Sequence, residues 1–294
     1  MNAVIELKGL TKFYGKQRGI ENVSFQVEEG EIFGFIGPNG AGKSTTIRTL
    51  LALFKPTGGS ATIFGKDCIK EADVIARDVG YVPSEAAYYD NMKVKELLSY
   101  TAELYRKDCK KKTEELCERL DLDRNRKIAD LSFGNKKKVG IVSALCHSPR
   151  LILLDEPTAG LDPLVQQTFF EILSEENERG ATIFLSSHIL SEVQKSCRRV
   201  AILKEGGLVG IQTIRELREN GFKKVSVTLR EAVPAESFKE DDVAQFVQEG
   251  VDLSFMYKGD VGVLLKKIAA LDVEDAFIEE PTLEEIFLHY YKQG

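Results

Sequence analysis

An α/β domain with a mostly parallel central sheet, followed by a smaller α+β domain, is the fold that this 294-residue sequence predicts. Short apolar runs alternate with helix-like stretches as far as about residue 210, which is the pattern of an α/β domain. The charge balance then changes, because residues 221–294 carry 8 Lys/Arg and 15 Asp/Glu, a net of −7, whereas the whole chain carries −6. A glycine-containing turn at Asn220-Gly221 coincides with this change. We therefore expect domains at 1–220 and 221–294.

The expected strands of the first domain are of two kinds. Residues 4–7 and 23–27 alternate apolar and polar side chains, as half-buried antiparallel strands do, and predict an antiparallel β-subdomain. Three other segments are almost continuously apolar, which is typical of parallel strands that are covered on both faces: residues 31–36, 151–154 and 182–185. These three runs are expected at the centre of the main sheet.

Between residues 90 and 120 the apolar spacing becomes helical. Leu97, Tyr100, Thr101 and Leu104 recur at i, i+3, i+4 and i+7, the spacing of one face of a helix. We expect a helical subdomain over about residues 86–146, inserted in the α/β domain.

The second domain mixes strand-like and helical segments. Residues 224–229, 253–257 and 276–278 are strand-like, and residues 261–270 are helical. A last helix is expected after Pro281, because Thr282 and Glu285 form a Thr-x-x-Glu capping box. The apolar face of that helix would consist of Leu283, Ile286, Phe287 and Tyr290.

Composition excludes several classes of protein. No apolar run approaches the ~18 residues that span a bilayer, and the first residues do not form a signal peptide, so neither membrane insertion nor secretion is expected. The five cysteines lack CxxC spacing and are expected as free thiols in a reducing cytoplasm. A nearly neutral first domain argues against nucleic acid as a partner. The lysine runs 110–112 and 136–138 are expected as solvated helix faces.

A glycine-rich loop follows the apolar run 31–36. It matches the pattern G-x-x-x-x-G-K-[ST] with the residues Gly37, Pro38, Asn39, Gly40, Ala41, Gly42, Lys43, Ser44 and Thr45. Glycines let successive backbone N–H groups converge on phosphate oxygens at a helix N-terminus. Lys43 would reach the β- and γ-phosphates, and Ser44 would bind Mg²⁺. The loop predicts a nucleoside triphosphate site, and an ordinary glycine-rich turn is the alternative.

Two carboxylates follow the apolar run 151–154. Asp155 is placed to hold Mg²⁺ through water, and Glu156 to orient or deprotonate the water that attacks the γ-phosphate. The alternative is a strand that merely ends in solvated carboxylates. The phosphate loop upstream favours the catalytic interpretation.

These motifs resemble the nucleotide-binding subunit of ATP-binding cassette (ABC) transporters, which has a phosphate-loop NTPase fold, over roughly residues 4–208. The segment Leu131-Ser132-Phe133-Gly134-Asn135 is similar to the family signature LSGGQ, with Phe133 and Asn135 as departures. The resemblance implies that Ser132, Phe133, Gly134 and Asn135 contact a γ-phosphate that is bound on another protomer. Taken alone, Ser132 is more simply an ordinary N-cap.

Further positions match the family in order. Asp162 resembles the carboxylate of the loop that crosses the dimer interface, and His188 the catalytic histidine that contacts the γ-phosphate and organises the attacking water. Tyr14 lies where the family places an aromatic ring under adenine, and base stacking on such a ring contributes ~1–3 kcal/mol. The alternative for Tyr14 is an ordinary core or surface tyrosine, because the neighbouring Phe13 could fill either role. The alternative for His188 is an ordinary histidine that follows a strand.

One position departs from the family pattern. The family usually has a glutamine that ligates Mg²⁺ after the Gly80-Tyr81-Val82-Pro83 segment, and Ser84 stands there, followed by Glu85. Serine is shorter, so it would act through a water, or Glu85 would replace it. We hypothesise that metal binding is coupled more weakly to this loop, without loss of ATPase activity.

The resemblance also implies the partners of the chain. Two copies placed head to tail would complete two sites for ATP and Mg²⁺, and ATP would close the dimer. Separate polytopic permease subunits would hold the chain on the inner face of the cell membrane, through the region 84–120. The tail resembles ATPases of bacterial exporters, whose cargo would be a drug, peptide antibiotic, lipid-like molecule or ion. An importer ATPase and a soluble ABC ATPase of translation or repair are the alternatives.

Overall fold

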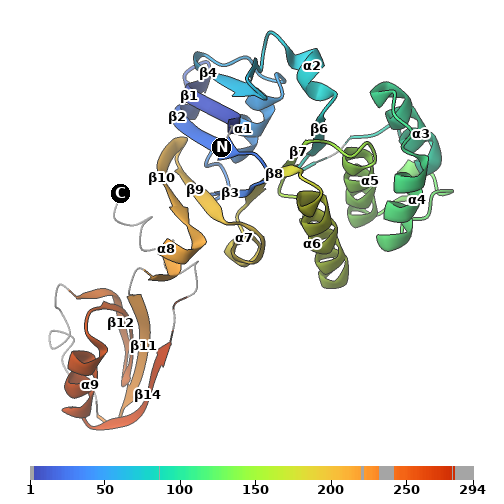
Figure 1. Ribbon diagram of the computed structural model, residues 1–294. Coiled ribbons are helices and arrows are strands. Elements are labelled where there is room, and N and C mark those ends of the chain that lie inside the picture. The colour runs from blue at the N-terminus through green and yellow to red at the C-terminus, as the bar shows by residue number, and fades with distance from the viewer. Residues whose placement is uncertain (1–2, 86, 220–221, 232–241, 280, 282–294) are drawn as a thin grey trace. The chain divides into compact units, whose positions relative to one another are not determined.

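Three sheets organise the part of the chain that the structure describes. The computed structural model describes residues 3–85, 87–219, 222–231, 242–279 and 281. Contacts divide the chain into two units, Met1–Ile211 and Gln212–Gly294 (Figure 1). The boundary that the sequence predicts, at Asn220-Gly221, lies outside the described residues.

Strands and helices alternate along the first unit, as the sequence predicts. The strands are β1 (Ala3–Tyr14), β2 (Gln17–Glu28), β3 (Ile32–Ile36), β4 (Gly58–Ile63), β5 (Lys66–Asp67), β6 (Val79–Val82), β7 (Leu151–Asp155), β8 (Thr182–Ser187), β9 (Arg199–Lys204) and β10 (Gly207–Thr213), which crosses the division. The helices are α1 (Lys43–Leu50), α2 (Ala72–Ala76), α3 (Val94–Tyr105), α4 (Lys110–Arg119), α5 (Phe133–Leu145), α6 (Pro163–Glu178) and α7 (Leu190–Ser196), with a 3₁₀ turn at Ile128–Asp130.

The main sheet has the strand order β10-β9-β3-β8-β7-β6, and β9, β3, β8, β7 and β6 run parallel. The three apolar runs of the sequence form β3, β8 and β7, which are neighbours at its centre, as predicted. Every residue of β7 and β8 is buried. Asp155 pairs with Ser186, and Ile36 with Ser187, so these strands end together. The loops that follow them therefore meet at one edge of the sheet.

The antiparallel subdomain is a second sheet with the order β2-β1-β4-β5. One face of its alternating strands is buried against the main sheet, in a core that includes an aromatic stack. Phe25 of β2 stacks on Phe33 and Phe184, with ring centroids 5.5 and 6.0 Å apart. Aromatic pairs of this kind contribute ~0.5–1.5 kcal/mol beyond the area that they bury. The stack therefore joins the two sheets.

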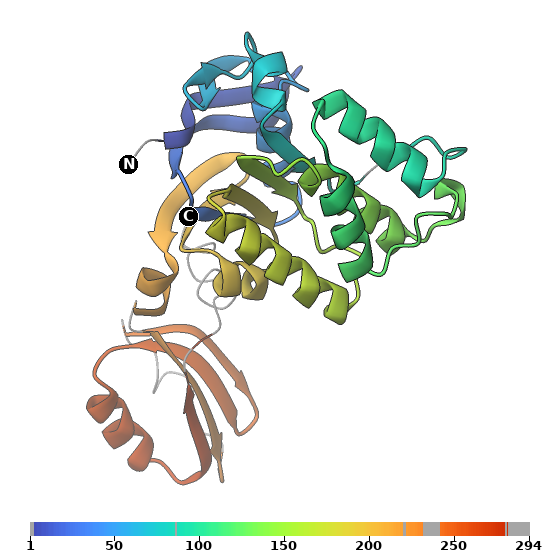
Figure 2. The ribbon, with the colours of Figure 1, turned by 45° about the vertical axis from the view of Figure 1, so that its right-hand side comes forward.

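Helices α3, α4 and α5 group together beside β6 and β7 (Figures 1 and 2). The predicted helical face is only partly buried, because Leu97 is covered while Tyr100 and Leu104 are exposed. The buried side of α3 instead carries Val94, Leu97 and Leu98, where it packs on α4 and α5. Apolar spacing thus located the helix but not its packed face. No helix among the described residues is long and apolar enough to cross a membrane.

A buried histidine follows α5. His147 is 3% exposed and stacks on Tyr105, with ring centroids 3.5 Å apart and planes 8° apart. Burial, with the nearby Lys107 ammonium, lowers the pKa of His147 to about 4. The imidazole is therefore neutral in the folded protein over a pH range in which an unfolded chain would protonate it.

The difference between the pKa of His147 in the folded and the unfolded chain predicts that acid destabilises the protein. The unfolded chain takes up a proton at His147 near its ordinary pKa of 6.5, and the folded chain only near 4, so the free energy of unfolding falls as the pH drops through this window. We expect His147→Phe, which keeps the stacking on Tyr105, to reduce the difference between urea midpoints measured at pH 7.5 and pH 5. Equal pH sensitivity in the wild type and the variant would show that another group is responsible.

In the second unit, the described residues form a four-stranded antiparallel sheet on which a helix packs. Its elements are α8 (Ile214–Glu219), β11 (Phe222–Leu229), β12 (Val243–Glu249), β13 (Asp252–Lys258), α9 (Val261–Ala269) and β14 (Val273–Glu279). The strand order is β12-β13-β11-β14, and α9 lies beside the sheet (Figure 1). Leu264 and Ile268 of α9 pack on the apolar side chains of the sheet. The second unit is therefore α+β, as predicted.

Sequence reasoning missed one of these strands. β12 is interrupted by a register shift between Ala244 and Val247, and Gln245 has a positive φ of 52°. A bulge of this kind breaks the two-residue alternation on which strand prediction depends. The predicted last helix, from Thr282 onward, lies outside the described residues.

Candidate nucleotide-binding site

The carboxyl edge of the parallel sheet gathers the residues that the motifs single out. The phosphate loop follows β3, Ser84 follows β6, Asp155 ends β7, and His188 follows β8. Because parallel strands all end at the same edge, loops distant in sequence lie side by side there, which is where open α/β sheets bind ligands. The structure thus brings together side chains from four separate segments.

The phosphate loop wraps around its own lysine. Lys43 is 4% exposed, and its Nζ donates to the carbonyl oxygens of Gly37 at 2.7 Å and Pro38 at 3.2 Å. Gly42 precedes α1 with φ 105°, and a Cβ there would lie 2.6 Å from the carbonyl oxygen of Gly19. Only glycine suits that position, so its place in the motif has a steric cause. The loop leads into the N-terminus of α1, where backbone N–H groups favour an anion.

Asp155 is held by two hydroxyl groups. Ser44 donates to its Oδ1 at 3.0 Å, and Ser186 of β8 donates to the same oxygen at 2.9 Å. The other oxygen, Oδ2, is buried and has no hydrogen-bond partner among the described residues. A buried, unpaired carboxylate oxygen beside a serine hydroxyl fits Mg²⁺, which prefers oxygen ligands. Sequence reasoning did not single out Ser186, because it lies within an apolar strand and no motif marks it.

Glu156 lies between a lysine and a histidine. Its Oε1 is 3.1 Å from the Nζ of Lys43, and its Oε2 is 3.0 Å from the Nδ1 of His188. The backbone of Glu156 has a φ of 47°, and its N–H donates to the carbonyl oxygen of Ser186 at 3.2 Å. A non-glycine residue in this region costs of order 1–2 kcal/mol, and such strain clusters at functional sites. Of the three predicted catalytic residues, Glu156 therefore contacts both of the others, Lys43 and His188.

A pocket of about 370 Å³ opens over these residues. It is lined by Tyr14, Gln17, Arg18, Gly19, Asn39, Gly40, Gly42, Lys43, Ser44, Thr45, Ser84 and Glu156. The side chain of Tyr14 is 42% exposed, and its hydroxyl lies 3.3 Å from the Oγ1 of Thr45. Sequence reasoning missed Gln17, Arg18 and Gly19, which follow the turn after β1 and belong to no motif.

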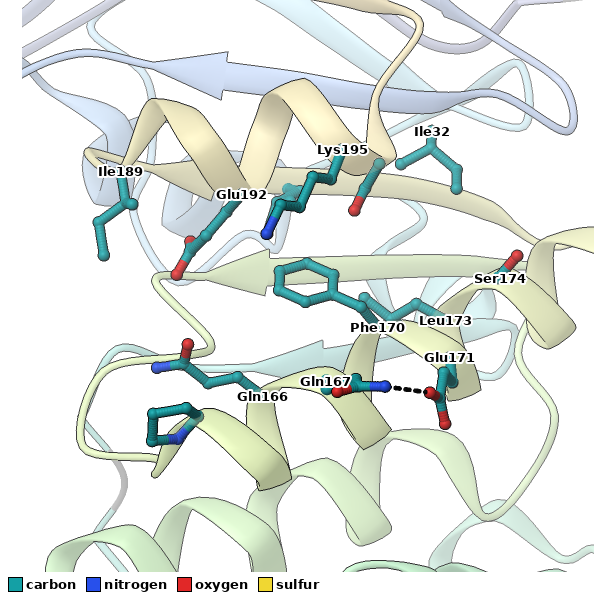
Figure 3. Close-up of a pocket in the computed structure, with 13 residues that line it drawn as sticks. Ile32, Gln166, Gln167, Phe170, Glu171, Leu173, Ser174, Ile189, Glu192 and Lys195 are labelled. Carbon is teal, nitrogen blue, oxygen red and sulfur yellow. Dashed lines mark hydrogen bonds between the residues drawn. The ribbon is translucent and has the colours of Figure 1, made fainter. Parts of the chain in front are cut away.

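A larger pocket of about 660 Å³ lies between α6 and α7 (Figure 3). Most of its lining comes from these two helices, including Phe170 and Lys195, and Gln167 donates to Glu171 at 3.0 Å. The carboxylates of Glu171 and Glu192 face this pocket, and no glycine lines it. Negative charge and the lack of a glycine-rich loop disfavour a polyphosphate there. The smaller pocket is therefore the candidate nucleotide site.

The signature residues and Asp162 do not line the pocket of their own chain, among the described residues. Ser132 caps α5 by accepting from the N–H of Asn135 at 3.3 Å, and Asp162 caps α6 by accepting from Val165 at 3.0 Å. Phe133 is 54% exposed, and a Cβ on Gly134 would lie 2.5 Å from the carbonyl oxygen of Gly160. The signature segment thus packs on the loop before α6, away from Lys43.

The prediction that both lysine runs are solvated is wrong for three lysines. Lys137 and Lys138 are buried, although Lys136 is partly exposed. Burial lowers the pKa of Lys137 to about 8, against the opposing effect of carboxylates at Asp155, Glu156 and Glu85. In the other run Lys110 and Lys111 are exposed, whereas Lys112 pairs with the buried Glu176. α5 packs on β6 and on two helices, so most of its circumference is covered.

Comparisons with known proteins show which family the chain belongs to. The family model described as ABC transporter matches residues 20–159. The chain is 35% identical to the bacitracin transport ATP-binding protein BcrA of Bacillus licheniformis, over 98% of this chain and 97% of that protein. It is 30% identical to the linearmycin resistance ATP-binding protein LnrL of Bacillus subtilis (strain 168), over 97% of each.

A solved structure shares the fold of the first unit. The dimeric post-hydrolysis state of the ATP-binding cassette MJ0796, bound to ADP and Pi, superimposes with a TM-score of 0.66 and 28% identity, over 72% of this chain and 99% of that one. The phosphate-loop NTPase fold and the two relatives, which match nearly the whole chain, lead to the same assignment. The chain belongs to the ABC transporter family, as an ATP-binding subunit.

Proposed function

We propose that the chain hydrolyses ATP to ADP and phosphate with Mg²⁺, and that two copies do so head to tail to drive membrane subunits of an exporter. The observation that carries the proposal is the contact of Glu156 with both Lys43 and His188, at 3.1 and 3.0 Å, beside the unpaired Oδ2 of Asp155. A base and a phosphate-binding cation thus line one small pocket, and His188, which would orient the base, contacts Glu156.

Hydrolysis requires a base that can accept a proton from water next to the γ-phosphate. Glu156 suits this step, because its carboxylate borders the pocket and is held on both sides. When ATP enters, its phosphates compete with Glu156 for the Lys43 ammonium. One carboxylate oxygen is then free to orient water, while His188 keeps the other in place. Lys43 offsets the negative charge of the transferred phosphoryl group.

Ser44 and Asp155 would hold Mg²⁺, with Ser84 as a third, weaker contact. Ser44 and Ser84 line the pocket, and Ser44 already bonds to Asp155. When bound, Mg²⁺ neutralises charge on the β- and γ-phosphates. Ser186 keeps the Asp155 carboxylate oriented through its bond to Oδ1.

A second copy would supply the part of the site that one chain lacks. The caps Ser132 and Asp162 are exposed, so they are accessible to another protomer. MJ0796, a family member that shares the fold, is a dimer in its ADP and Pi complex. Tyr14 would stack on adenine, and Ser132, Phe133, Gly134, Asn135 and Asp162 would contact the ATP that is bound to the partner copy.

Exposed apolar side chains between residues 89 and 104 support a membrane partner. Tyr89, Tyr100 and Leu104 are exposed, and a pocket of about 560 Å³ is lined by Tyr89, Asp90, Asn91, Met92 and Tyr100. Monomeric proteins seldom leave such groups uncovered together, unless they bind a partner. A cytoplasmic helix of a permease is the occupant we propose, which would place the chain at the inner face of the membrane. The relatives named for bacitracin transport and linearmycin resistance favour export of a peptide or drug.

Purification with the membrane fraction tests this function. We expect the tagged full-length chain to co-purify with a polytopic membrane protein, and that protein to raise the rate of ATP hydrolysis several-fold. Tyr100→Glu should reduce both effects and leave the basal rate of the isolated chain unchanged. Recovery of ribosomes or DNA in place of a membrane protein would contradict the transport function and favour an ABC ATPase of translation or repair. Uptake of a cargo, dependent on an external binding protein, would favour an importer.

A further inference from the structure

Lys137 connects the signature helix to the loop that carries Ser84. It lies in the second turn of α5 and is 3% exposed. Its Nζ donates to the carbonyl oxygens of Pro83 at 2.8 Å and Ser84 at 3.0 Å. A buried ammonium needs such acceptors, because removing a charge from water is costly unless it is hydrogen-bonded. The lysine therefore ties α5 to the backbone just before and at Ser84.

The Tyr88 side chain of the same loop lies close to the same face of α5. Gly140 is one turn beyond Lys137, and a Cβ there would lie 2.7 Å from the hydroxyl oxygen of Tyr88. Residues three apart share one face of a helix. Tyr88 is well covered, and burial raises its pKa to about 12. The loop is thus bonded to α5 through Lys137, and Gly140 leaves space for the nearby Tyr88 hydroxyl.

These contacts link the Ser84 loop to the signature helix α5. Ser84 lines the nucleotide pocket of its own chain, and Ser132 begins the helix that Lys137 ties to it. We propose that Lys137 is a positioning residue: its ammonium holds the short Ser84 side chain against the bound metal-nucleotide, and links that site to the signature helix that serves the partner copy. This inference rests on the proposed function, in which Mg·ATP occupies the pocket.

A purely structural tie between helix and loop is the competing explanation, and metal dependence separates the two. If Lys137 acts through Ser84, its loss weakens binding of Mg·ATP but leaves binding of ATP without metal unchanged. If Lys137 only supports the fold, both affinities change together or neither does.

The test is calorimetric titration of the full-length chain with ATP, in Mg²⁺ and in EDTA. We expect Lys137→Met to raise the Kd for Mg·ATP about tenfold, the size expected for a lost charged hydrogen bond, and to leave the Kd in EDTA within about twofold. Lys137→Arg should restore most of the affinity, because a guanidinium can also donate to two carbonyl oxygens. Lys111→Met, at an exposed lysine of α4, is the matched control and should change neither value.

A double-mutant cycle completes the test. In a Ser84→Ala background, Lys137→Met should add little to the Kd for Mg·ATP, because residues that act through one another are not additive. Additive effects, or equal changes with and without Mg²⁺, would overturn the proposal. Wild-type chain that binds Mg·ATP but does not hydrolyse it would refute the proposed function, while these binding data would still decide the inference. Thermal melting of each variant identifies any loss of folded protein.

Discussion

Glu156→Gln should lower the kcat for ATP hydrolysis by about 10²–10⁴-fold, the contribution typical of a general base. The amide oxygen can still accept a hydrogen bond from Lys43, which lies 3.1 Å from Oε1, but it cannot take a proton from water. The affinity for ATP should therefore be unchanged or higher, because no phosphate contact is lost. Release of phosphate at saturating Mg·ATP gives the rate, and calorimetric titration gives the affinity.

A matched control separates this effect from a general loss of charge. Glu171→Gln makes the same substitution at an exposed carboxylate in the larger pocket, and should hydrolyse ATP at the wild-type rate. A general base contributes about 10²–10⁴-fold to the rate. If Glu156→Gln retained more than about a tenth of the wild-type kcat, the loss would be too small and Glu156 would not be that base.

Lys43→Met should abolish both tight ATP binding and hydrolysis. The ammonium is 4% exposed and contacts Gly37, Pro38 and Glu156, so it lies within the loop that would bind the phosphates. Loss of one preorganised group that stabilises charge in the transition state lowers the kcat by about 10²–10³-fold. Calorimetry should show weaker ATP binding, and phosphate release should fall to background.

The Lys43 variant also removes a partner from two carbonyl oxygens and from Glu156, so its stability must be measured. Groups left unpaired in this way cost about 1–3 kcal/mol each, and we expect a lower melting temperature. Lys8→Met, at an exposed lysine of β1, should preserve both binding and melting temperature. Wild-type ATP affinity in a folded Lys43→Met chain would show that the phosphates bind elsewhere.

The main site was predictable because its motifs lie at the ends of apolar strands. Three nearly continuous apolar runs predicted β3, β7 and β8, and parallel strands place the loops that follow them at one edge. Lys43, Asp155, Glu156 and His188 could therefore be expected to meet before any contact was known. The structure adds the pairwise contacts among them, which depend on side-chain orientation that no spacing rule supplies.

Residues that act through packing were not predictable in the same way. Lys137 stands in a run of three lysines, and the sequence does not show which of them the neighbouring loop covers. Ser186 is one of three polar residues in the buried strand β8, and its role became visible only through its bond to Asp155. Tyr100 and Leu104 follow helical spacing yet are exposed, because packing by α4 and α5 covers a different side of α3. These outcomes depend on contacts between segments that are distant in sequence.

Completion of the ATP site by a second copy can be measured directly on Glu156→Gln, in which bound ATP would persist. The molecular mass of the full-length variant should be that of the 32.8 kDa monomer with ADP, and twice that with Mg·ATP, in light scattering after size exclusion. Adding Ser132→Arg should keep the chain monomeric with Mg·ATP, because the signature of one copy could no longer approach the phosphates on the other. A Glu156→Gln chain that binds Mg·ATP tightly but remains a monomer would contradict the head-to-tail site.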